Sequence, residues 1–161
     1  MEDTAIVYYS LDGNTDYIAR RIAEKTGAKL VRLETKRAYP RKGFKKFFIG
    51  GRDALFGAQP ELKSPLPDLA PFRNIVIGTP VWASRPAPAI NTFLRRAKLD
   101  GKRIALFACS GGGQSETCLD KMQALLAGST ILCCASFVSP VFKSGKAIDD
   151  AIDEIVSALS E

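Results

Sequence analysis

Three short segments of this 161-residue chain contain small polar residues, two of them together with glycine, and could hold an anionic, planar ligand. Residues 10–15 (Ser-Leu-Asp-Gly-Asn-Thr) run into the pattern of a helix start, where backbone N–H groups and the helix dipole attract an anion. Residues 79–84 (Thr-Pro-Val-Trp-Ala-Ser) contain Trp82, the single tryptophan, whose indole could stack on a flat ring. Residues 110–115 (Ser-Gly-Gly-Gly-Gln-Ser) contain three consecutive glycines, so backbone amides could approach a ring edge closely.

Each segment also has a purely structural interpretation. Asn14 or Thr15 could cap a helix after a tight turn, without any ligand. Trp82 could cover the edge of a sheet, and the three glycines could form a flexible turn. A single segment therefore does not separate binding from structure, and the elements around all three have to be considered together.

The residue types exclude several kinds of chemistry. The chain has no histidine, which rules out Ser-His and Cys-His nucleophiles and imidazole metal sites. Its four cysteines form no C-x-x-C pair, and three of them lie within apolar stretches. We expect structural thiols in a reducing compartment and no metal site. The cysteines are Cys109, Cys118, Cys133 and Cys134.

Short β-like runs alternate with helical periods along the chain. Hydrophobic residues make up 46% and charged residues 25%, which is typical of a globular domain. The pattern predicts strands at Thr4–Tyr9, Lys29–Leu33, Asn74–Gly78, Arg103–Cys109 and Thr130–Val138. It predicts helices from Thr15 to Gly27, Ala89 to Ala97, Cys118 to Leu126 and Ile148 to Leu159.

This alternation predicts an α/β fold with a parallel sheet and right-handed crossovers, in one domain over residues 1–161. The irregular part is Thr35–Pro71, for which we expect a helix over Gly43–Phe56 and then a proline-rich return. In an open parallel sheet, ligands bind beyond the carboxyl ends of the strands. The three polar segments each follow a strand, so all three are expected at that edge.

A phosphate cradle, an aromatic face and an amide-lined slot at adjacent strand ends describe a site for flavin mononucleotide (FMN). The sequence resembles flavodoxins and flavodoxin-like FMN proteins of the short-chain type over essentially its whole length. The motifs that carry the resemblance are Ile6–Thr15, Ile77–Ser84 and Phe107–Gly113. The resemblance implies a doubly wound five-stranded parallel sheet in the order 2-1-3-4-5, with helices on both faces.

The same resemblance implies which residues bind FMN. Ser10, Gly13, Asn14 and Thr15 would hold the phosphate. Thr79, Pro80, Val81 and Trp82 would line one side of the ring and the ribityl chain, and Ser110, Gly111, Gly112 and Gly113 would face the other side and the pyrimidine edge. Leu11, Asp12, Ala83 and Cys109 complete the expected cofactor-binding set; no residue is assigned a catalytic role.

Two features depart from the family pattern. Asp12 stands where the family usually has a threonine that touches phosphate. Two unit charges about 6 Å apart repel by roughly 3 kcal/mol at an effective dielectric near 20, so Asp12 must point away or be neutralised if FMN is bound tightly. The second feature is a net charge of +6, whereas flavodoxin carriers are typically acidic. Seven basic residues and no acid lie between Lys36 and Arg52.

We therefore expect an FMN-binding redox protein that transfers electrons. The alternatives are an FMN-dependent NAD(P)H oxidoreductase acting on quinones or similar small acceptors, and a module of this fold that has lost FMN. The basic Lys36–Arg52 segment is either a solvated face or a docking surface for an acidic redox partner. It carries no recognisable nucleic-acid motif. No apolar run reaches membrane-span length, the N-terminus lacks a secretory pattern, and a cytoplasmic location is expected.

Overall fold

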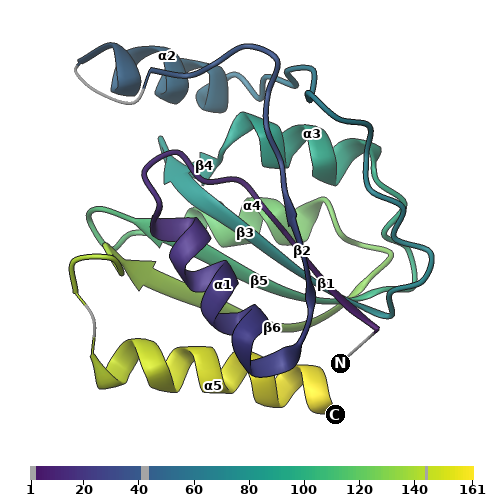
Figure 1. The fold of residues 1–161 in the computed structure, drawn as a ribbon. Helices are drawn as coiled ribbons and strands as arrows, with labels where there is room; N and C mark the ends of the chain where they lie inside the picture. Colours follow the sequence, from purple (N-terminus) through teal and green to yellow (C-terminus); the bar gives the residue numbers. More distant parts are fainter. Residues whose placement is uncertain (1–2, 41–43, 144) are drawn as a thin grey trace.

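The computed structural model describes residues 3–40, 44–143 and 145–161, with side chains in the helix that starts at residue 44 described from residue 48 onward. Strands and helices alternate as the sequence pattern predicts (Figure 1). The elements are β1 (Thr4–Tyr8), α1 (Asn14–Thr26), β2 (Lys29–Arg32), α2 (Phe44–Leu55), β3 (Asn74–Trp82), β4 (Arg85–Pro86), α3 (Pro88–Arg96), β5 (Arg103–Ser110), α4 (Glu116–Ala124), β6 (Thr130–Val138) and α5 (Lys146–Ser160).

The main sheet is parallel and has the order β2-β1-β3-β5-β6. This confirms the predicted five-stranded sheet of order 2-1-3-4-5, because β5 and β6 are its fourth and fifth strands. The sequence did not predict β4, a two-residue strand that pairs antiparallel with the end of β3. Ala83 and Ser84 connect β3 to β4 with φ angles of 49° and 57°, a left-handed conformation that non-glycine residues rarely adopt. The result is a tight hairpin at the carboxyl end of β3.

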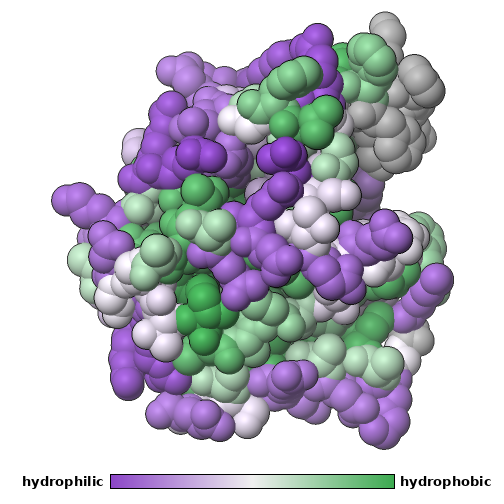
Figure 2. Space-filling view, turned by 180° about the vertical axis from the view of Figure 1, so that it is seen from behind, coloured by the Kyte–Doolittle hydropathy of each residue, from purple (hydrophilic) through white to green (hydrophobic). Residues whose placement is uncertain are grey.

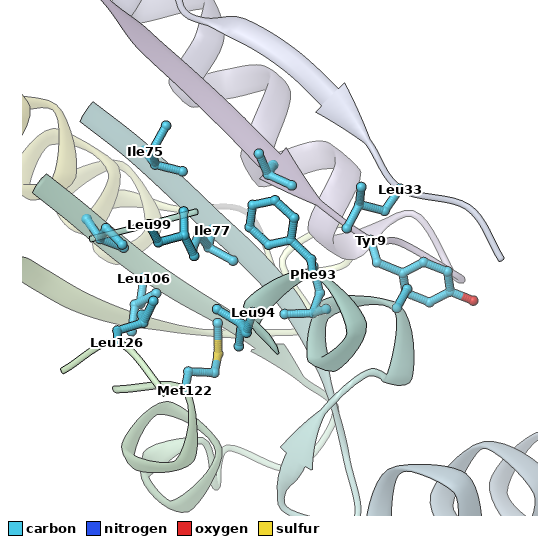
Figure 3. Packing of buried hydrophobic residues seen from close by; sticks show 14 of the residues in the cluster. Tyr9, Leu33, Ile75, Ile77, Phe93, Leu94, Leu99, Leu106, Met122 and Leu126 are labelled. Carbon is cyan, nitrogen blue, oxygen red and sulfur yellow. The ribbon is translucent and has the colours of Figure 1, made fainter. Parts of the chain in front are cut away.

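Helices cover both faces of the sheet, as predicted. α1 and α5 pack on one face, where Ile18, Ile22 and Ile152 are fully buried against β1, β3 and β5. α3 and α4 pack on the other face (Figure 1). Figure 3 shows Phe93 of α3 and Met122 of α4 among the aliphatic side chains of the strands.

One close approach in the core requires a glycine. A Cβ at Gly78 of β3 would lie 2.1 Å from Cζ of Phe107 on β5, so the phenyl ring occupies the space of the missing side chain. Phe107 also meets Phe137 of β6 edge to face, with ring centroids 6.1 Å apart. The Phe107 ring therefore packs against both neighbouring strands, β3 and β6, on the face that carries α1 and α5.

The long connection between β2 and β3 contains α2, close to the predicted bounds. α2 does not lie on a face of the sheet; it packs against β3, β4 and α3 beyond the carboxyl end of β3 (Figure 1). Asn91 of α3 holds its end, because the Asn91 amide donates hydrogen bonds to the carbonyls of Gly57 and Ala58 at 2.8 and 3.0 Å. Phe48 and Phe56 are 62% and 79% exposed.

One lysine forms hydrogen bonds with the end of the proline-rich part of this connection. Lys102 Nζ donates hydrogen bonds to the carbonyls of Leu69 and Phe72 at 2.8 and 2.6 Å. On the face that carries α3 and α4, apolar patches alternate with hydrophilic surface (Figure 2). None of the helices in the described ranges is long and apolar enough to cross a membrane.

Candidate cofactor site

The structure brings the three predicted segments together at the carboxyl edge of the sheet. The predicted segments are residues 10–15, 79–84 and 110–115. Around them we define loop I (residues 9–15, including the first two residues of α1), loop II (residues 79–87) and loop III (residues 110–115). β1, β3 and β5 are parallel neighbours, with Tyr8 opposite Gly78 and Pro80 opposite Cys109. Loops I and II also touch, because the Tyr9 and Trp82 rings lie 5.8 Å apart between centroids. The predicted clustering is thus present.

Loop I is a tight turn that leaves the start of α1 open. The Gly13 N–H donates a hydrogen bond to Ser10 Oγ at 3.2 Å, and Gly13 has a φ of 93°. Gly13 is the N-cap residue of α1, and no side chain caps the helix. The alternative in which Asn14 or Thr15 caps α1 is therefore wrong. Within the part of the chain that the structure describes, no side chain accepts a hydrogen bond from the first-turn N–H groups of α1, which suits an anion.

Thr15 adds an unsatisfied donor at the same place. Its hydroxyl is buried and makes no hydrogen bond with the described residues. The Cys109 thiol lies beside it, but the pair does not meet the geometry of a hydrogen bond. Burial raises the pKa of this thiol to about 12, and the weak contact with the Thr15 hydroxyl lowers it only in part. A buried hydroxyl without a partner costs about 1–3 kcal/mol. A phosphate oxygen at the start of α1 would supply the missing acceptor.

The other predicted residues of loop I differ in their surroundings. Asn14 Oδ1 accepts a hydrogen bond from the backbone N–H of Val141 at 3.2 Å, which links α1 to the loop before α5. That contact uses the oxygen of the Asn14 amide and leaves its NH₂ group as a donor. Leu11 is half-buried against the core, and Asp12 is exposed at the tip of the loop.

A charged cluster beneath loop I was not predicted. Arg32 of β2 donates to the Ser10 carbonyl at 3.0 Å and lies 3.6 Å from the Asp16 carboxylate. Tyr8 donates its hydroxyl hydrogen to the same carboxylate at 2.6 Å. Burial, together with Asp16, raises the pKa of Tyr8 to about 12. Partial burial alone would raise the pKa of Asp16, but Arg20, Tyr8 and Arg32 together lower it below its usual value.

Loop II is held by its own threonine. Thr79 is fully buried; its hydroxyl donates to the Pro80 carbonyl at 3.0 Å and accepts from the Ala87 N–H at 2.9 Å. Thr79 therefore shapes loop II, and a direct contact between its hydroxyl and the cofactor stays a prediction. Pro80 and Val81 are half-buried, whereas Ala83 is exposed at the hairpin turn.

Trp82 packs inside an aromatic cluster of the protein itself. Its ring lies edge to face with Tyr9 and with Tyr39, at centroid distances of 5.8 and 5.2 Å. A Cβ on Gly50 of α2 would come within 3.0 Å of Trp82 Cζ3. The indole is half-buried, and these contacts link loop I, loop II and α2. Stacking of Trp82 on a flavin stays a prediction, and Tyr9, Tyr39 and Gly50 are the neighbours that sequence reasoning missed.

Loop III repeats the geometry of loop I. The Gly113 N–H donates to Ser110 Oγ at 2.9 Å, and Gly113 has a φ of 88°. A Cβ at Gly111 or Gly112 would have no atom within 4 Å, so both glycines border open space. Ser115, the N-cap residue of α4, is buried and its hydroxyl has no partner among the described residues. The Ser-x-x-Gly spacing in both loops is a sequence signal for this turn.

The described residues fit FMN in their chemistry. Loop I offers uncapped N–H groups and a buried orphan hydroxyl for the phosphate. Loop III offers exposed backbone beside open space for a ring edge. The cysteines are free thiols, with Cys109 buried beneath loop I and Cys134 exposed on the edge strand.

The predicted basic docking segment is described only in part. Residues 41–43 and the side chains of residues 44–47 lie outside the described residues. At both ends of the segment, its bases form ion pairs with acidic residues outside it. Arg37 and Arg52 lie 3.6 and 3.4 Å from the Asp53 carboxylate, and Lys36 lies 3.0 Å from the Glu61 carboxylate. These bases are therefore partly neutralised.

The chain matches one protein family and is similar to several solved structures. Residues 3–152 match the model of a family described as flavodoxin. The structure is similar to a flavoprotein in complex with FMN from Lactobacillus acidophilus NCFM, with 25% identity, 91% of this chain and 100% of that chain covered, and a TM-score of 0.71. It is also similar to a protein from Bacteroides uniformis ATCC 8492, with 22% identity, 96% of this chain and 97% of that chain covered, and a TM-score of 0.78. Two-electron reduced Megasphaera elsdenii flavodoxin is similar as well, with 22% identity, 96% of each chain covered, and a TM-score of 0.64. No curated protein sequence matches the chain.

Proposed function

The chain belongs to the flavodoxin family, and we propose that it binds FMN non-covalently and transfers electrons through it. The family match and the similar flavoprotein that contains FMN support this cofactor. The observation that carries the proposal is the start of α1, where no side chain caps the helix and the buried Thr15 hydroxyl has no partner among the described residues. This arrangement suits a phosphate group.

Different residues of the chain would bind different parts of FMN. Bound FMN would supply the electron chemistry at its flavin ring, and the protein would set its orientation and potential. The N–H groups at the start of α1, with the hydroxyl of Thr15, would bind the phosphate. Thr79 holds loop II in shape through its two hydrogen bonds. Loop III would present backbone amides to the ring edge.

The phosphate contact is tested with a matched pair of variants. Thr15→Val removes the orphan hydroxyl at nearly constant volume, and hydrogen bonds to charged groups contribute about 1.5–3 kcal/mol. We expect FMN affinity to fall by about 10-fold to 100-fold and riboflavin affinity to stay unchanged, because riboflavin lacks the phosphate. Ser115→Ala, which removes the other buried orphan hydroxyl at a helix start, is the control and should affect both ligands equally. Equal losses of both flavins in Thr15→Val would contradict the proposal.

The effect of Asp12 on FMN affinity distinguishes a functional flavoprotein from a module of this fold that has lost its cofactor. If its charge opposes the phosphate, Asp12→Thr should tighten FMN and leave riboflavin unaffected. A ligand with about 31 heavy atoms and about 0.3 kcal/mol per atom binds with roughly sub-micromolar affinity. A purified sample that is colourless and stays so when FMN is added would support the module instead.

The identity of the electron donor and acceptor would distinguish an electron carrier from an oxidoreductase. We propose an electron carrier that docks an acidic partner protein near Lys36–Arg52. Electrostatic steering raises the association rate, so electron transfer from an acidic donor should slow as salt increases. Changing Lys42, Lys45 and Lys46 to Glu should slow it further and leave FMN affinity unchanged. Direct oxidation of NAD(P)H by the FMN-loaded protein, with reduction of a quinone, would favour the oxidoreductase instead.

A further inference from the structure

A pocket that shares only Arg85 and Pro86 with loop II lies apart from loops I and III. It has a volume of about 230 Å³ and opens between the end of α2, β4, α3 and the C-terminal half of α4. It is on the side of the sheet seen in Figure 2, which carries α3 and α4. Three cationic side chains line it, from Arg85, Arg95 and Lys121, and none of the described residues that line it is acidic. No residue of loop I or loop III contributes, so the pocket is separate from the expected phosphate site.

The three cations have no acidic partner within residues 3–40, 48–143 and 145–161. Among the described residues, none of the ion pairs includes Arg85, Arg95 or Lys121. Other exposed bases do have partners, as Lys36 has in Glu61 and Lys63 has in Glu34. The three positive charges around the pocket repel one another, and an anion bound between them would offset that repulsion.

The wall of the pocket is fixed by a buried amide. Asn91 is only 7% exposed, and its NH₂ group bonds the carbonyls of Gly57 and Ala58. Its oxygen accepts a hydrogen bond from Arg95 Nε at 3.1 Å. One side chain thus ties the end of α2 to α3 and orients the guanidinium, whose terminal NH₂ groups stay available. The cationic wall is therefore held in place.

The lining selects the kind of ligand. Two guanidinium groups favour planar, bidentate recognition of phosphate or carboxylate oxygens. A phosphoryl group carries close to two negative charges near neutral pH and matches three cations better than a single carboxylate does. Pro86 and Leu125 add apolar surface, and the volume is below the roughly 300 Å³ at which pockets for drug-sized ligands begin. A small phosphorylated compound fits this site better than a macromolecule.

We propose that the pocket between α2, β4, α3 and α4 binds the phosphoryl groups of a small molecule through Arg85, Arg95 and Lys121. This site is distinct from the FMN phosphate site at loop I. It does not depend on the proposed electron transfer. The phosphoryl groups could be those of free pyrophosphate or those of the pyrophosphate within a dinucleotide, since both present the same chemistry to the three cations.

The test is a calorimetric titration with inorganic pyrophosphate at low salt. It is carried out on the protein as purified and again after saturation with FMN, which blocks loop I. We expect 1:1 binding in both samples, weakened about tenfold or more by Arg85→Gln, Arg95→Gln or Lys121→Gln, because each removes a charged hydrogen-bond donor. Arg96→Gln is the matched control: Arg96 follows Arg95 on α3 but lines a different pocket with Glu61, and its loss should change affinity less than twofold.

Three results would overturn the proposal. They are no binding of pyrophosphate, equal weakening by Arg96→Gln and Arg95→Gln, and binding that disappears when FMN is present. If an acidic peptide binds and pyrophosphate does not, the first of these results is obtained and the occupant is a protein. Thermal unfolding of each variant, and backbone NMR shifts on α3 and α4 during the titration, show whether the fold is kept and where the anion binds. A second arm with NADPH separates the sources: competition with pyrophosphate indicates a dinucleotide, and absence of competition indicates the free anion.

Discussion

Gly50 and Gly51 lie side by side in α2, yet a methyl group would meet different surroundings at each. A Cβ at Gly50 would lie 3.0 Å from Trp82 Cζ3 and 3.1 Å from Trp82 Cε3. A Cβ at Gly51 would lie 4.0 Å from the Cβ of Ala83, an ordinary contact. Gly50→Ala and Gly51→Ala therefore make the same change in the helix backbone and differ only in this packing.

The magnitudes follow from two opposing effects. Alanine is favoured over glycine inside a helix by about 1 kcal/mol, which applies to both variants. Overpacking a fixed neighbour costs roughly 1–3 kcal/mol, and Trp82 is fixed by the rings of Tyr9 and Tyr39. Gly51→Ala should raise the free energy of unfolding by about 0.5–1 kcal/mol. Gly50→Ala should leave it unchanged or lower it by up to about 2 kcal/mol.

Urea unfolding measures the difference, and fluorescence shows its cause. Trp82 is the single tryptophan, so the emission spectrum reports directly on the ring that would be displaced. We expect a shifted emission maximum and weaker FMN binding in Gly50→Ala only, because loop II carries Trp82. Equal stabilisation of the two variants with unchanged emission would refute the tight contact between Gly50 and the indole.

Three further changes test the framework around the site. The fold lowers the pKa of Asp16, so the Asp16 carboxylate stabilises the protein above about pH 4, and this stabilisation is lost as the pH falls through the folded pKa. Asp16→Asn should therefore lower the free energy of unfolding by about 1–2 kcal/mol at pH 7 and by much less at pH 2.5. Chemical denaturation at each pH measures the difference. Ser84→Gly should stabilise by roughly 1 kcal/mol in thermal unfolding, because glycine adopts the left-handed turn conformation without strain; a lower melting temperature would contradict this. Lys102→Met should destabilise by about 1.5–3 kcal/mol, since two backbone carbonyls lose a charged donor, whereas exposed Lys98→Met should change stability by less than about 0.5 kcal/mol.

The sheet and its edge could be predicted because their signals are local. Apolar runs such as Thr4–Tyr8 and Arg103–Ser110 identify strands buried on both faces, and Gly27 marks the end of α1. Once the strands are parallel, the loops that follow them meet at one edge whatever their sequence. The clustering of loops I, II and III therefore follows from the strand pattern.

The contacts within that edge could not be predicted, because they depend on packing between distant segments. Nothing near Trp82 in the sequence indicates that Tyr39 and Gly50 surround it. The β3–β4 hairpin has Ala83 and Ser84 at its turn, where Asn-Gly or Asp-Gly would have been the recognisable signal. Arg32 belongs to a strand whose alternation gave no reason to connect its guanidinium with the Ser10 carbonyl.

The phenyl ring that fills the space beside Gly78 links two positions that are 29 residues apart in the sequence. A larger residue at position 78 is compatible with this sheet only if position 107 becomes smaller, since the added Cβ would lie 2.1 Å from Phe107 Cζ. A larger residue at position 78 therefore requires a change at position 107, and a double-mutant cycle of Gly78→Ala with Phe107→Leu should show strong coupling. Among diverging relatives, we expect glycine at the first position to accompany an aromatic residue at the second, so this pair would covary even though neither side chain belongs to the proposed cofactor site.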